Sequence, residues 1–164
     1  DSLKALSLKS NNLTELPLSL PHCCPHLVSV NLEKNHLTSL PETTKSWRHL
    51  KHLLLAWNKL GCGRGLEKSM LPDTVEEIDL RYNKCRIIPT CLWEASNVRV
   101  NSPSCCIIRS LLLGGNDLGE SLAMVTKDMW AALPLLEILD LSQNRLTNLG
   151  GLPWAAATTI IKHL

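Results

Sequence analysis

The chain is poor in aromatic residues and has no long apolar run. Of its 164 residues, five are Trp, one is Tyr and none is Phe. A core of this composition has to be built from aliphatic side chains, which excludes a core centred on aromatic clusters. No apolar stretch approaches the roughly 18 to 20 residues of a membrane-spanning helix, and the N-terminus does not have the pattern of a signal peptide.

The excess of positive charge is also small. Seventeen basic residues oppose 15 acidic residues, which gives a net charge of +2. The lysines are dispersed along the chain, so the composition gives no support to a nucleic-acid-binding function. We expect a protein as the partner, with no nucleic acid, no membrane insertion and no small-molecule substrate.

The cysteines do not form a complete disulfide framework, because there are seven of them. They include two adjacent pairs, Cys23–Cys24 and Cys105–Cys106, within which a bridge is geometrically poor. We therefore expect free thiols and a reducing, cytoplasmic location. An extracellular location is the alternative, and the glycosylation sequon "NLT" at Asn12–Thr14 would fit it, although the repeat described next accounts for that triplet as well.

A repeated spacing dominates what the sequence does contain. The pattern L-x-x-L-x-L-x-x-N, with other aliphatic residues allowed in place of Leu, begins near residues 3, 27, 50, 75, 108 and 136. In a strand, L-x-L turns both aliphatic side chains to one side, and stacked copies form a continuous apolar column. The asparagine is expected to bond the backbone where the chain turns out of the strand.

This spacing resembles the leucine-rich repeat family over nearly the whole chain. The resemblance implies an α/β solenoid, a leucine-rich repeat horseshoe with a concave parallel β-sheet and a convex side of irregular, 3₁₀ and helical segments. We expect residues 1–164 to be one solenoid fragment of six repeats. Ile161 and Leu164 match the start of a seventh repeat, so the fragment is expected to be uncapped at both ends.

The intervals between successive repeats are 24, 23, 25, 33 and 28 residues. The short repeats have room for a return by a turn or a short 3₁₀ helix. In the last interval, Leu122, Val125, Met129 and Leu133 are spaced by three or four residues, which favours an α-helix on the convex side. In the longest interval, from residue 75 to residue 108, the stretch 83–108 is either an inserted loop or a degenerate repeat.

Motifs that could carry chemistry lack the required spacing. "HCCPH" at His22–His26 concentrates potential metal ligands, but a structural zinc site needs separated pairs. "GCGRG" at Gly61–Gly65 has no lysine followed by Ser or Thr, as a phosphate-binding loop would. We therefore predict no metal, no cofactor and no catalytic residues in this chain.

Candidate binding residues lie at outward positions of the third and fourth repeats. There Trp57 and Tyr82 stand at equivalent positions, among charged side chains. Exposed Trp, Tyr and Arg often carry most of the energy of an interface. The alternative is that both rings only cover the edge of the sheet and stack on each other. The predicted partner-binding set on the concave face is His52, Leu54, Trp57, Glu77, Asp79, Arg81 and Tyr82.

The L-x-x-L-P endings, the uneven repeat lengths and the expected free cysteines resemble the intracellular repeats of ROCO proteins, in particular leucine-rich repeat kinases. That resemblance implies a non-catalytic scaffold or regulatory segment that binds protein partners or the GTPase and kinase domains of its own parent. The alternative function is that of an extracellular receptor ectodomain that binds a protein ligand. The number of free thiols distinguishes the two.

Overall fold

Six short strands form one sheet in the computed structural model, which describes residues 2–61, 66, 71–89, 92, 107–119, 121–124 and 133–147. Each strand comes from one copy of the repeated pattern. The strands are β1 (Ala5–Ser7), β2 (Ser29–Asn31), β3 (His52–Leu54), β4 (Glu77–Asp79), β5 (Ser110–Leu112) and β6 (Ile138–Asp140). The predicted solenoid of stacked repeats is confirmed.

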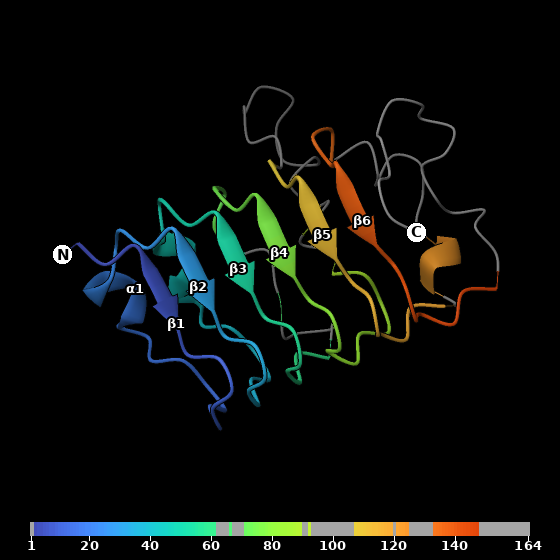
Figure 1. Cartoon of the computed structure of the whole chain (residues 1–164), viewed down its shortest axis with the longest axis horizontal. Helices are drawn as coiled ribbons and strands as arrows, with labels where there is room; N and C mark the ends of the chain where they lie inside the picture. The colour runs from blue at the N-terminus through green and yellow to red at the C-terminus, as the bar shows by residue number, and fades with distance from the viewer. Residues whose placement is uncertain are drawn as a thin grey trace.

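All neighbouring strands are parallel, and their order in the sheet is their order in the chain (Figure 1). The pairing places equivalent repeat positions side by side, so that Leu6 faces Val30 and Val30 faces Leu53. The same register continues to β6. A given repeat position therefore forms a row of side chains that runs across the whole sheet.

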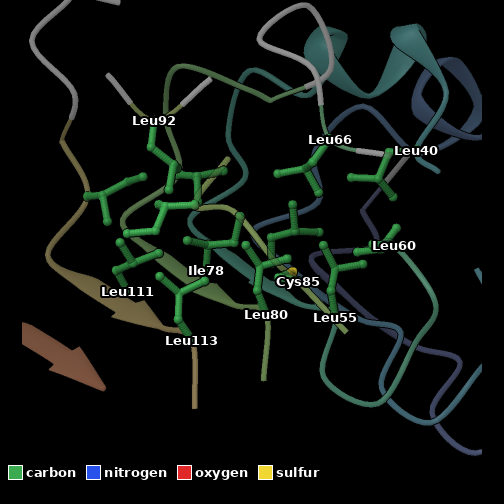
Figure 2. Packing of buried hydrophobic residues seen from close by; sticks show 14 of the residues in the cluster. Leu40, Leu55, Leu60, Leu66, Ile78, Leu80, Cys85, Leu92, Leu111 and Leu113 are labelled. Carbon is green, nitrogen blue, oxygen red and sulfur yellow. The ribbon is translucent and has the colours of Figure 1, made fainter. Parts of the chain in front are cut away.

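The core lies on one side of this sheet. The middle residue of each strand points into it, and from β2 onward that residue is buried, whereas its two neighbours in β2, β3, β5 and β6 are only half-buried. Figure 2 shows the resulting aliphatic cluster, with Ile78 and Leu111 from the strands beside Leu80 and Leu113 from the segments that follow them. We call the opposite side of the sheet, whose residues alternate with the core leucines, the open face.

The described helices between the strands are short. They include α1 (Leu20–Cys23), η1 (Glu42–Ser46) and η5 (Ser121–Met124), of which η1 and η5 are 3₁₀ helices. The 3₁₀ return after β2 follows the prediction for short repeats, and the single α-helical turn α1 has Pro21 in its first turn, where proline is tolerated. After η1, Trp47 is buried, and its Nε1 donates to the carbonyl oxygen of Cys24 at 3.1 Å.

The predicted convex α-helix is wrong over η5, which is a 3₁₀ helix. Leu122 is buried there, as its spacing indicated, but the same apolar spacing is compatible with a tighter return. Val125 and Met129 lie outside the described residues, as do most of the long fourth interval and the expected seventh repeat. Within the described segments, no helix has the length and apolarity needed to cross a membrane.

The cysteines differ from one another in the structure. Cys85 occupies the position of a core leucine, two residues after Asn83, and Figure 2 shows its sulfur within the aliphatic cluster. It is disulfide-bonded, to a partner that is not among the described residues. The expectation of free thiols throughout is therefore wrong at Cys85, because an odd count excludes only a complete set of bridges. Cys23 is free and exposed, and Cys24 is free and packs partly against the core.

Candidate functional site

Buried asparagines fix the direction in which the chain leaves each strand. Asn58 donates from Nδ2 to the carbonyl oxygens of Leu55 in its own repeat and Leu32 in the preceding one, both at 2.9 Å. Its Oδ1 accepts the backbone N–H of Leu37 at 3.0 Å. Equivalent bonds between repeats are made by Asn35, Asn83, Asn116 and Asn144. The predicted structural role of the asparagine is confirmed, and these bonds join each repeat to the next.

The residue before each asparagine has a left-handed backbone. This row, which we call the left-handed row, consists of Ser10, Lys34, Trp57, Tyr82, Gly115 and Gln143, with φ between 54° and 69°. Such values are uncommon for residues other than glycine. Here they are held by hydrogen bonds to the next repeat, for example from the Trp57 N–H to the Arg81 carbonyl oxygen at 2.9 Å. The row therefore presents its side chains side by side along the edge where the strands end.

Trp57 and Tyr82 stack within this row. Their ring centroids lie 4.0 Å apart with an interplanar angle of 16°, and the Tyr82 hydroxyl donates to Oε1 of Gln143 at 3.2 Å. A Cβ atom at Gly115 would overlap the Tyr82 ring, so the glycine lets that ring lie over the fifth repeat. Trp57 remains 52% exposed. The two rings thus form an aromatic surface that reaches from the third repeat to the sixth.

An open hollow of about 590 Å³ lies next to this aromatic surface. Its lining is mostly apolar, and the polar side chains around it are basic or amide groups. We call it the edge hollow, and it is lined by Lys34, Asn35, His36, Trp57, Asn58, Lys59, Tyr82, Lys84 and Gly115. It therefore combines exposed ring surface with several cationic groups at the edge of the sheet.

The lysines of the edge hollow form no ion pair with the described part of the chain. Among the described residues, no carboxylate lies within ion-pair distance of Lys34, Lys59 or Lys84. Other lysines on the molecule are paired, as Lys51 is with Glu76 at 2.8 Å. The positive charge at the hollow is consequently not neutralised by the part of the chain that surrounds it.

The charged residues of the open face are mostly engaged with one another. His52 Nδ1 lies 2.9 Å from Glu77 Oε2, and Arg81 Nη2 donates to Asp79 Oδ2 at 2.7 Å. Asp79 also accepts the backbone N–H of Arg81 and is only 2% exposed. Its predicted exposure is wrong, because the short side chain folds back onto the turn after the strand. Asp79 therefore positions Arg81 and does not itself face a partner.

Two pKa shifts accompany these contacts. The hydrogen bonds to Asp79 raise the pKa of Arg81 despite its partial burial, so the guanidinium stays charged. Burial alone would raise the pKa of Glu33, but hydrogen bonds from Lys9 and Asn31 outweigh it and lower that pKa below its usual value. Both ions are thus held in their charged forms, at positions that directly precede the left-handed row.

The structure separates the seven predicted residues into three pairs and Leu54. The ring pair Trp57 and Tyr82 borders the edge hollow. His52 and Glu77 pair across β3 and β4, Asp79 at the end of β4 pairs with Arg81 just after it, and Leu54 at the end of β3 is half-buried. The sequence reasoning did not select the other residues of the hollow. Alignment of the repeats could have found them, since they either share the left-handed row or follow the asparagine directly: Lys34, His36, Lys59, Lys84 and Gly115.

Metal ligands do not gather in the described part of the chain. No group of three or more His, Cys, Asp or Glu side chains there is arranged to hold an ion. In the "HCCPH" segment, the ring of His26 instead lies 5.5 Å from that of His49.

Comparison with known proteins gives matches to family models and to individual proteins. Leucine-rich repeat family models match residues 1–60 and residues 132–153, together half of the chain. The chain is 26% identical to leucine-rich repeat-containing protein 3 of Danio rerio over 156 residues, which are 85% of this chain and 56% of that protein. It is 34% identical to lumican of Bos taurus over 90 residues, which are 54% of this chain and 25% of lumican.

Among solved structures, internalin C2 of Listeria monocytogenes superposes with a TM-score of 0.59, over 96% of this chain and 68% of that one. The sequence identity is 19%, so this likeness concerns the fold. The chain spans between a quarter and about half of the two relatives named above. The repeated pattern, the parallel sheet of stacked strands and these matches agree, and the chain belongs to the leucine-rich repeat family.

Proposed function

We propose that this segment is a non-catalytic module that binds a protein partner through the open face of its sheet and the adjoining edge hollow. Leucine-rich repeat domains generally act in protein–protein interaction. The observation that carries the proposal here is the stacked pair of Trp57 and Tyr82, which is partly exposed beside unpaired lysines. Aromatic side chains of this kind are the usual energetic centre of an interface.

The proposal can be tested by photocrosslinking from defined positions of the solenoid. The photoreactive residue p-benzoylphenylalanine would replace Leu112, which is half-buried on the open face, or Leu18, which is 66% exposed on a return segment. We expect one discrete protein adduct from position 112 in the cells that produce the parent protein, and none from position 18. Equal adducts from both positions, or none from position 112, would contradict binding through the open face.

We further propose that the module works in an oxidising compartment, as a secreted or cell-surface protein. The support is the disulfide at Cys85, since such bridges are rare in reducing compartments. Asn12 and Thr14 of the sequon are both exposed, so a glycan at Asn12 would meet no packed surface. The second hypothesis is that the chain is a regulatory segment of a ROCO protein. That hypothesis rests in part on the expectation that the cysteines are free.

A thiol titration under denaturing conditions distinguishes the two compartments. The bridge at Cys85 consumes two of the seven cysteines, so protein taken from its native source should show five or fewer reactive thiols. Digestion with a glycosidase should in addition lower the apparent mass if Asn12 carries a glycan. Seven reactive thiols would instead favour the ROCO hypothesis and a cytoplasmic location.

A further inference from the structure

We propose that the edge hollow receives a short acidic peptide segment of the partner, with a proline or aromatic ring of that segment against Trp57 and Tyr82. The inference rests on the proposed protein-binding function and adds the chemistry of the bound segment. It follows from three properties of the hollow, which are its ring surface, its unpaired charge and its length.

The ring surface favours a flat or cyclic apolar group. One face of Trp57 is covered by Tyr82, but the residue as a whole is 52% exposed, and it lines the hollow. Tyr82 is held by its hydrogen bond to Gln143 and by the space above Gly115, so the pair needs little ordering when a ligand binds. A preorganised aromatic surface costs less entropy on binding than a flexible one.

The unpaired charge favours an acidic ligand. Lys34, Lys59 and Lys84 line the hollow from the second, third and fourth repeats, and His36 adds a further nitrogen. No carboxylate of the described residues neutralises these lysines, whereas Lys9 on the same sheet is paired with Glu33 at 2.5 Å. Carboxylates of a ligand would restore charge balance here and would also accelerate its association.

The length of the hollow fits an extended peptide. Its lining residues come from the second repeat to the fifth, which are three strand spacings apart. At about 4.8 Å per spacing this is roughly 14 Å, the length of about four extended residues at roughly 3.3 Å each. An acidic segment of four to six residues would therefore contact the rings and the lysines at the same time.

The test uses a fluorescent peptide of sequence Glu-Asp-Pro-Trp-Glu-Glu and measures its binding to the chain by fluorescence anisotropy. Lys59→Glu/Lys84→Glu should weaken binding about tenfold or more at low salt, because two attractive charges become repulsive. Trp57→Ala/Tyr82→Ala should weaken it by a similar factor at every salt concentration, since the ring contact is not electrostatic. Circular dichroism checks that each variant is folded.

The matched control is Lys45→Glu/Arg48→Glu, which changes the net charge by the same amount. Both residues are exposed, and neither lines the hollow. This variant should keep the affinity within about twofold, because its charges do not border the hollow and are screened by solvent. Equal loss in both charge variants would show that the peptide responds only to net charge, and would overturn the proposal.

A second arm replaces the peptide with heparin, a sulfated glycan. Binding of heparin that depends on Trp57 and Lys59, with no binding of the peptide, would overturn the peptide assignment in favour of a glycan ligand. Adducts from position 112 that persist in Lys59→Glu/Lys84→Glu and Trp57→Ala/Tyr82→Ala would leave the proposed protein-binding function intact and refute only the role of the hollow.

Discussion

Two adjacent rows of residues recur in every repeat of this solenoid and differ in their exposure to solvent. The asparagine row is buried from the second repeat onward and uses its side chains to join neighbouring repeats. The left-handed row precedes it by one residue, has φ near 55° to 70° throughout, and includes the exposed Trp57. The residue type is therefore constant in the asparagine row, whereas it varies in the left-handed row directly before it.

This difference shows that the two rows have separate roles. Each buried asparagine satisfies carbonyl and N–H groups of two repeats, and no other side chain has the same donors and acceptors at that reach. In the left-handed row the hydrogen bonds are made by the backbone, so the side chain is not needed for them. Selection for a ligand can act on the left-handed row without altering the solenoid.

Among substitutions in the two rows, replacement of a buried asparagine should lower the stability of the solenoid most. Asn58→Ala leaves the buried Leu37 N–H without its acceptor, and it removes the bond to the Leu32 carbonyl, which keeps only its bond from Asn35. We expect the free energy of unfolding to fall by about 2 to 4 kcal/mol, measured by urea denaturation.

Asn11 provides the matched control in the first repeat. It bonds the carbonyl oxygen of Leu8 in its own repeat, but it is exposed and makes no bond to another repeat. Asn11→Ala should therefore change stability by only about 0.5 kcal/mol. Equal losses at Asn11 and Asn58 would mean that the bonds between repeats contribute little.

The sequence predicted the buried side of the molecule better than its surface. Regular spacing of leucines and asparagines was enough to place the strands, because stacked repeats bury the same positions each time. Asp79 was assigned to the surface by that alternation, but its carboxylate bonds Arg81 and the backbone of the turn. The lysines of the edge hollow were missed because Lys34 and Lys59 occupy different repeat positions and meet only when the repeats are stacked.

A substitution in the left-handed row should have an intermediate effect. Gly115→Ala places a Cβ atom against the Tyr82 ring at a φ of 69°. We expect a loss of about 1 to 3 kcal/mol, of which about 1 kcal/mol comes from the left-handed backbone. Differential scanning calorimetry of the single variants and of Gly115→Ala/Tyr82→Ala separates the two terms.

In the Tyr82→Ala background, only the backbone cost of Gly115→Ala should remain. Tyr82→Ala alone should change stability little, because the ring is at the edge of the sheet and not in the aliphatic core. If Gly115→Ala costs the same with and without the Tyr82 ring, the two residues are not coupled and the ring does not depend on the glycine for its position.

The smallest effect is expected from the ion pair of Lys9 and Glu33, which lie one position before the left-handed row in the first two repeats. The pKa of Glu33 is lowered in the folded protein, so the folded state binds its proton less readily than the unfolded chain. The stability from this carboxylate is therefore present above its unfolded pKa and disappears as the pH falls through the folded pKa. Glu33→Gln should cost about 1 kcal/mol or less near pH 7, and the difference from the wild-type protein should disappear once the pH lies below the folded pKa of Glu33. Glu76→Gln is the comparison, because the Lys51 hydrogen bond lowers the pKa of Glu76 as well, but the Glu76 side chain is more exposed than that of Glu33, 31% against 14%, so solvent screening weakens its pair more. A difference between Glu33→Gln and wild type that persists at low pH would mean that the Glu33 side chain acts through packing and hydrogen bonding to Asn31, and not through its charge.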